Sequence, residues 1–213
     1  IAAAVRPHPP GDGRELVASH PGTVAVRAEP GRSVRRADLS GFLLALPTGE
    51  CPADFSADSA SPVASEAASV AEAIEAGARV LLFDEDTSAP SFLARDGRMQ
   101  RLVPRPGEPI VPLVDRAREM YERLGVSTIL ATGGSGDVLE AAHTVIRMRE
   151  WRAEDATAAA AEAVSASGPP RVREALPGLR APAAREARLE LRDAQGALRL
   201  PHLVQHRDDL VGV

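Results

Sequence analysis

The chain has 213 residues, of which 44% are hydrophobic but only 3% aromatic, and its formal charge is −5. This length suits one large domain, with or without a small appendage, built around an aliphatic core. The acidic balance argues against a protein that coats nucleic acid with its whole surface. The single cysteine, Cys51, excludes an internal disulfide and a zinc site made of several cysteines. No stretch approaches eighteen consecutive apolar residues, so we expect no membrane span. We also expect a cytoplasmic location.

The N-terminal part is rich in turns and predicts short strands. Residues 8–15 form a loop of Pro, Gly and Asp, and strands are expected near residues 15–18, 24–28 and 33–38. Val24 and Val26 alternate with Ala25 and Arg27, as in a half-buried strand. A turn at residues 29–32 predicts that the second and third strands pair as an antiparallel hairpin.

From about residue 60 to residue 168, predicted strands and helices alternate. A helix over 61–76 ends at Gly77, an apolar strand spans 80–83, and a helix from Val111 or Pro112 to Leu124 ends at Gly125. A strand over 127–131 leads into a glycine loop at 132–137. A helix over 138–142, a strand over 144–148 and a helix over 153–166 complete the unit. This alternation predicts an α/β fold with a parallel sheet.

The composition changes after residue 168. Small residues and prolines at 165–170 give way to a stretch rich in Pro, Arg and Ala. We therefore predict one domain over residues 1–168, followed by a linker and the start of a small C-terminal domain over 169–213. Residues 186–192 and 197–200 could form a small hairpin in that appendage.

The strand at residues 80–83 ends in two adjacent carboxylates, Asp84 and Glu85. In open α/β sheets this edge binds ligands, and the pattern has the form of a Walker B strand. In such a strand one carboxylate holds Mg²⁺ on a nucleotide and the next orients an attacking water. The alternative is that the two residues only cap the turn that follows. No phosphate-binding G-x-x-x-x-G-K-[ST] loop accompanies them, because the chain contains no lysine.

Several separated segments resemble the predicted ATPases of the ABC class, a soluble family distinct from the ABC transporters. They are H-P-P-G-D-G-R-E at 8–15, R-A-E-P-G-R at 27–32, A-I-E-A-G-A at 73–78, L-F-D-E-D-T-S-A at 82–89 and G-G-S-G-D at 133–137. The resemblance spans residues 8–160. It implies an ABC-type P-loop NTPase fold that uses ATP and Mg²⁺ and forms a head-to-tail homodimer. It also implies that this chain is a C-terminal fragment whose Walker A loop lies upstream of Ile1.

The resemblance assigns roles to individual residues. Asp84 would bind Mg²⁺ and Glu85 would polarise the attacking water. Asp86 and Ser88 would belong to a D-loop along the subunit interface, for which the alternative is a plain surface turn. The remaining nucleotide contacts would come from two small-residue loops, a signature with Ser61 and Ser65 and a glycine loop with Gly133, Gly134, Ser135 and Gly136.

Two features of the signature depart from the family. Pro62 replaces a glycine and removes an N–H donor, and Glu66 would place negative charge near the phosphate, so both should weaken γ-phosphate binding. An ordinary helix start, with Ser61 as the cap and Pro62 in the first position, fits the segment as well. Ser135 or neighbouring N–H groups could contact the γ-phosphate or the water. The alternative there is a flexible turn capped by Asp137.

Three arginines, Arg14, Arg32 and Arg95, are candidates for phosphate or partner contacts. The Arg-rich residues 171–192 could touch RNA, whereas His202 and His206 are best explained as surface histidines. We therefore expect ATP binding and hydrolysis by a larger protein, of which residues 1–213 alone neither bind ATP tightly nor hydrolyse it. A silenced nucleotide-dependent interaction module and an RNA-associated protein are the alternatives.

Overall fold

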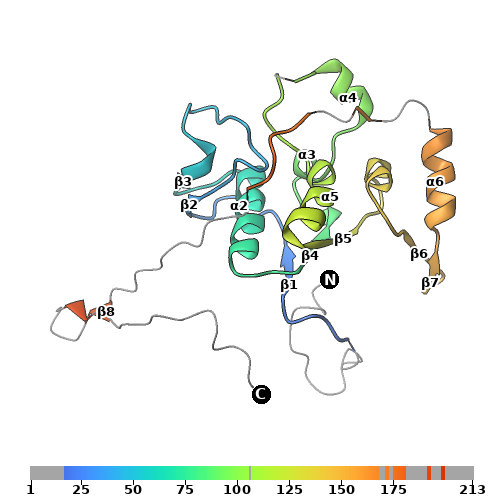
Figure 1. Cartoon of the computed structure of the whole chain (residues 1–213), viewed down its shortest axis with the longest axis horizontal. Coiled ribbons are helices and arrows are strands. Elements are labelled where there is room, and N and C mark those ends of the chain that lie inside the picture. The colour runs from blue at the N-terminus through green and yellow to red at the C-terminus, as the bar shows by residue number, and fades with distance from the viewer. Residues whose placement is uncertain are drawn as a thin grey trace. The chain divides into compact units, whose positions relative to one another are not determined.

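A computed structural model describes residues 17–105, 107–167, 171–172, 175–180, 191–192 and 198–199. Its centre is a parallel three-stranded sheet in the order β1–β4–β5, made of β1 (Thr23–Val26), β4 (Val80–Asp84) and β5 (Ser127–Ala131) (Figure 1). Ala25 lies beside Leu82, which lies beside Ile129. The predicted α/β fold with a parallel sheet is thus confirmed.

One face of this sheet carries the hydrophobic core. Leu81 and Phe83 project from it and are fully buried, together with Met120 and with alanines of the covering helix such as Ala68. The covering helices are α2 (Pro62–Glu75) and α5 (Leu113–Leu124). Since alanine has only one side-chain carbon, α2 approaches its neighbours closely. The short helix α3 (Pro90–Leu93) adds Phe92 to the core, between the rings of Phe42 and Phe83.

The opposite face of the sheet is only partly covered. Ala25 and Ile129, which flank Leu82 on this face, are exposed, and Ile129 keeps 57% of its surface accessible. Leu82 itself is buried at the centre. Parallel sheets are normally covered on both faces, so this face has apolar surface still to bury.

The predicted hairpin between the second and third strands is wrong. β1 pairs with β4 in the parallel sheet, and β2 (Val34–Ala37) pairs instead with β3 (Phe55–Ala57). The predicted turn does form, with Arg32 N–H donating to Glu29 O at 3.1 Å. The chain then diverges from β1, because Gly31 N–H donates to Ala60 O and Ala60 N–H donates to Arg32 O.

Four further elements of the first unit are short. They are the 3₁₀ helices η1 (Pro52–Asp54), η2 (Glu85–Thr87) and η3 (Gly136–Glu140) and the helix α4 (Gly97–Leu102). The predicted helix over 138–142 is therefore a 3₁₀ turn that begins earlier. Helix α5 starts at Leu113 and ends at Gly125, whose φ of 65° is left-handed, as predicted from the glycine.

The prediction for residues 144–166 was partly wrong. β6 (Ile146–Arg149) and β7 (Arg152–Asp155) form an antiparallel hairpin outside the main sheet, and helix α6 (Thr157–Ala166) begins after it, four residues later than expected. The two-residue turn at Glu150 and Trp151 has positive φ at both positions. This geometry matches the twist of a tight hairpin. Glutamate and tryptophan are not residue types that predict such a turn.

The first compact unit extends past the predicted boundary at residue 168. The chain divides into units over 1–182 and 183–213. Leu179 is 5% exposed, and Arg116 donates to Pro177 O at 2.7 Å, so this segment packs on the first unit. In the second unit, β8 (Leu191–Arg192) and β9 (Leu198–Arg199) form the small hairpin that was predicted. Of the strand expected at 15–18, residues 17 and 18 are not in a strand and the others lie outside the described residues.

Candidate functional site

The carboxyl ends of β4 and β5 bring two predicted site segments together. Asp84 and Ala131 are paired neighbours at the last position of these strands. Glu85 follows the first strand directly, and the loop over 132–135 follows the second. Parallel strands end at the same edge of a sheet, and this edge is where α/β folds bind ligands.

Glu85 is held by four donors from that loop. Its Oε2 atom accepts hydrogen bonds from Thr132 Oγ1 at 2.7 Å, Gly133 N at 2.8 Å and Gly134 N at 2.9 Å. Its Oε1 atom accepts one from Ser135 Oγ. Two consecutive N–H groups and two hydroxyls converging on one anion make a backbone nest. The loop therefore binds a carboxylate here by the same chemistry that would bind a phosphoryl group.

These bonds change the chemistry of Glu85. The Ser135 and Thr132 hydroxyls, followed by the Gly134 and Gly133 N–H groups, hold the pKa of this carboxyl far below its ordinary range. All four bonds favour the charged form, and three of them converge on Oε2, which leaves acceptor capacity on Oε1. In this arrangement Glu85 is bound by the loop that follows β5, and these bonds make its carboxylate a weaker base.

Asp84 lies at the start of η2 beside this nest. Its Oδ1 atom accepts a hydrogen bond from Asp86 N at 3.2 Å. Among the described residues no group of three or more His, Cys, Asp or Glu is arranged to hold a metal ion. Mg²⁺ is usually held by one or two carboxylates, with phosphate oxygens and waters completing the shell. The carboxylate of Asp84 offers oxygen ligands of the kind that Mg²⁺ prefers, so it fits such a site.

The start of α2, where the signature was predicted, is an ordinary capped helix. Ser61 Oγ accepts a hydrogen bond from Ala64 N at 3.2 Å, and Pro62 occupies the first helical position. The N–H of Ser65 bonds to Ser61 O, and Pro62 has no N–H to offer. The capping interpretation of this segment is confirmed. A nucleotide contact by Ser61 stays a prediction.

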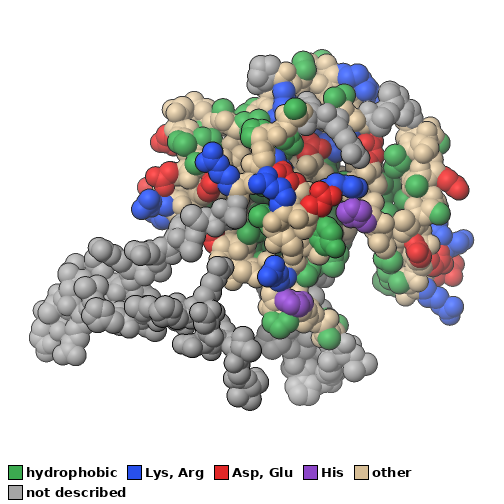
Figure 2. All heavy atoms as spheres, viewed as in Figure 1, with side chains coloured by type: hydrophobic (Ala, Val, Ile, Leu, Met, Phe, Trp, Pro, Cys, Tyr) green, Lys and Arg blue, Asp and Glu red, His purple; other side chains and the backbone are tan. Residues whose placement is uncertain are grey.

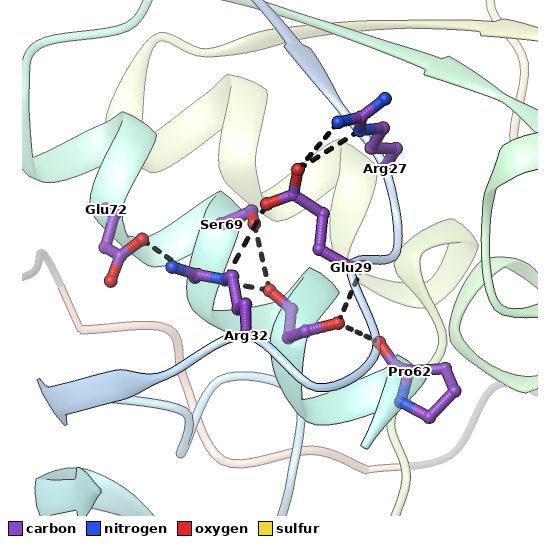
Figure 3. Close-up of polar contacts among 7 residues, drawn as sticks. Arg27, Glu29, Arg32, Pro62, Ser69 and Glu72 are labelled. Carbon is purple, nitrogen blue, oxygen red and sulfur yellow. Dashed lines mark hydrogen bonds and ion pairs between the residues drawn. The ribbon is translucent and has the colours of Figure 1, made fainter. Parts of the chain in front are cut away.

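Ser65 lies inside the protein, where its hydroxyl bonds to the turn at residues 29–32; Glu29, Arg32 and Glu72 of this cluster are labelled in Figure 3. Its hydroxyl accepts from Glu29 N at 2.9 Å and donates to Pro62 O at 2.8 Å. Beside it, Arg32 pairs with Glu72 at 2.8 Å. A ligand contact through the Ser65 side chain would have to break these bonds. Arg32, one of the candidate phosphate ligands, is committed to an internal ion pair instead.

Glu66 has a different role from the one predicted. It does not face a phosphate, because its side chain is fully buried and Oε2 accepts a hydrogen bond from Ala89 N at 2.8 Å. Burial raises the pKa of this carboxyl, against a smaller lowering effect from the Ala89 N–H. Glu66 thus ties the start of α2 to the end of the predicted D-loop. The spacing of Glu66, Val70 and Ala73 on one helical face was the signal that could have shown its burial.

The predicted D-loop residues differ in exposure. Asp86 is exposed on η2, whereas Ser88 is only 8% exposed and lies inside the subunit. Ser88 N–H bonds to Glu85 O at 3.3 Å, so the loop curls back on itself. Within a single chain, Asp86 is therefore the residue of this pair that a partner could reach, and both assignments stay predictions.

The other predicted arginine contacts are mostly internal. Arg95 donates to Met99 O at 2.9 Å and also bonds Val103 O, and Arg171 pairs with Asp115 at 2.9 Å while only 7% exposed. On the face shown in Figure 2, acidic and basic side chains are interspersed. Arg14, His202, His206 and most of the predicted RNA-contacting stretch lie outside the described residues.

A comparison with family models identifies the family of this chain. The model of the P-loop domain of the ABC ATPases matches residues 1–180, and the chain therefore belongs to that family. The comparison with curated proteins found no match to the chain. None of the helices in the described part of the chain is long and apolar enough to cross a membrane.

Proposed function

We propose that this chain forms the Walker B half of an ATP-hydrolysing site in a protein that binds Mg-ATP. The observation that supports this proposal most strongly is the pairing of Glu85 with a donor-rich glycine loop at the ends of two adjacent parallel strands. Membership of the P-loop family indicates that the ligand is a nucleotide. The reaction is attack of water on the γ-phosphorus, which breaks the bond to the bridging oxygen and yields ADP and phosphate.

Each residue has one part in that reaction. Asp84 would hold Mg²⁺, which neutralises charge on the phosphates when it is bound. Glu85, once out of its nest, accepts a hydrogen bond from the attacking water and orients it. The N–H groups of Gly133 and Gly134 and the hydroxyl of Ser135 stabilise the negative charge that develops on the transferred group. Gly136 leaves room beside them, because a side chain carbon built there meets no atom within 4 Å.

The phosphate-binding loop itself would come from a segment outside these 213 residues. The sequence holds no lysine for such a loop. The sheet face with exposed Ala25 and Ile129 is an apolar surface that a helix following that loop would cover. We therefore expect the 213-residue chain alone to bind ATP weakly and to hydrolyse none.

The protein would act as a head-to-tail homodimer. In this arrangement the capped start of α2, with Ser61, faces the nucleotide of the other subunit, and Asp86 lies at the interface. Mixing subunits that carry Glu85→Gln with subunits that carry Ser61→Ala tests this arrangement. Activity in the mixture above the sum of the two separate variants would support it, and strict additivity would count against it.

A silenced module is the second candidate, and the start of α2 favours it. Pro62 lacks an N–H, and the N–H groups of Ala64 and Ser65 are bonded within the helix, so few donors remain for a γ-phosphate. Such a protein would bind ATP and change shape without turnover. Pro62→Gly distinguishes the two: a large gain in rate supports silencing, and an unchanged rate supports an active enzyme.

The metal assignment is tested on the intact protein that includes the phosphate-binding segment. Turnover is measured against Mg²⁺ concentration for the wild type and for Asp84→Asn. We expect the variant to need at least about tenfold more Mg²⁺ for half-maximal rate, since it loses a charged ligand. Equal Mg²⁺ dependence in both proteins would remove Asp84 from the metal site.

A further inference from the structure

The loop at 132–135 is already an occupied anion site. Three donors meet Glu85 Oε2 at 2.7 to 2.9 Å, and Ser135 Oγ meets Oε1. The occupant is the side chain of Glu85 at the start of η2, which follows a different strand from the loop. A site that satisfies four donors with one exchangeable carboxylate could satisfy them equally with another anion of similar oxygen geometry.

We propose that Glu85 is an internal substitute ligand of this nest, and that a phosphoryl group displaces it. The same donors cannot serve both anions, so binding of one releases the other. A nucleotide with a terminal γ-phosphate that reaches the loop would therefore free Glu85 to meet the attacking water. ADP has no such group and would leave Glu85 bound. The identity of the phosphoryl donor rests on the proposed function, whereas the anion site itself does not.

The surroundings of the nest allow this exchange. Thr132, Gly133 and Gly134 are exposed, so a ligand reaches the donors without any core rearrangement. Gly133 has no atom within 4 Å of where a side chain carbon would be. At Gly134 that carbon would meet Glu85 Oε1 at 3.4 Å, which shows how closely the carboxylate approaches the loop. Glu85 is only partly buried, so it can swing away into solvent.

The test titrates inorganic phosphate into the full chain labelled with ¹⁵N-glycine, whose 17 glycines give a simple spectrum. Glu85→Ala empties the nest, and we expect phosphate to shift the Gly133 and Gly134 signals with an affinity at least about tenfold higher than in the wild type. The matched control is Asp137→Ala, which removes one negative charge close to the loop without touching the nest. We expect it to bind phosphate as the wild type does.

A second variant keeps the test informative if Glu85→Ala does not fold. Glu85→Gln keeps the size of the side chain but loses its charge, so we expect it to bind phosphate more tightly than the wild type and less tightly than Glu85→Ala. No gain in either variant, or an equal gain in Asp137→Ala, would overturn the proposal. If phosphate binds the emptied nest but the intact protein neither binds nor hydrolyses ATP, the anion site stands and the proposed function fails. If ATP is hydrolysed but the emptied nest binds no phosphate, only this inference fails.

Discussion

Replacing Glu66 tests whether a buried acid joins α2 to the loop after β4. Its carboxyl is inaccessible to solvent, Oε2 accepts the Ala89 N–H at 2.8 Å, and Oε1 has no hydrogen-bond partner. Glu66→Ala removes a buried methylene, worth about 0.8 kcal/mol. It also leaves the Ala89 N–H without an acceptor, which costs about 1–3 kcal/mol. We expect a total loss of about 2–4 kcal/mol in the free energy of unfolding.

Glu66→Gln separates the hydrogen bond from the charge. The glutamine oxygen still accepts from Ala89 N–H, and its amide replaces the oxygen that lacks a partner. Because burial raises the pKa of Glu66 in the folded state, the folded protein binds this proton more tightly than the unfolded chain does. The resulting stability is present below the unfolded pKa and is lost as the pH rises through the folded pKa. The stability of Glu66→Gln relative to the wild type should therefore rise from pH 4.5 upward.

The assay is urea denaturation followed by far-UV circular dichroism at pH 5 and pH 8. Fluorescence would not report on the core, since Trp151 is 97% exposed on the β6–β7 turn. Glu122→Gln, at an exposed position of α5, makes the same change of charge and serves as the control. If Glu66→Gln and the wild type differ by the same amount at both pH values, the account of Glu66 is refuted.

Two further predictions concern the core and the surface. Phe92→Ala removes a ring that lies 5.1 Å from the ring of Phe42 and 6.5 Å from that of Phe83, and should cost about 3–5 kcal/mol by the same denaturation assay; a loss below 1 kcal/mol would show that this cluster is not the core. Trp151→Ser should change stability by less than about 0.5 kcal/mol, because the side chain is almost entirely exposed. A larger loss in that variant would mean that the hairpin tip packs against something within the chain.

Local sequence signals predicted the elements that form the site. The apolar run before Asp84 and the glycines after β5 marked two strands and their ends, and Gly77 and Gly125 marked helix ends. Each of these features depends on residues within a few positions of one another. Glu85 and the glycine loop meet because these two predicted strands are parallel and end at the same edge of the sheet.

Pairings between distant segments could not be predicted in the same way. β1 carries a half-buried pattern that suits a hairpin with β2 equally well, and only its packing on the core selects β4 as its neighbour. The hairpin turn at Glu150 and Trp151 lacks the Asn-Gly or Asp-Gly pair that usually marks such a turn. The four bonds to Glu85 likewise join segments about fifty residues apart, and no spacing along the chain reveals them.

The most direct test of the central claim is ATP hydrolysis by the intact protein with Glu85 replaced by Gln. The measurement pairs the turnover number with the dissociation constant for Mg-ATP, and Glu122→Gln is again the control. If Glu85 orients the water, turnover falls by about a hundredfold or more while ATP binding does not weaken, because the uncharged side chain competes less for the nest. A Glu85→Gln protein that hydrolyses ATP at the wild-type rate would contradict the account.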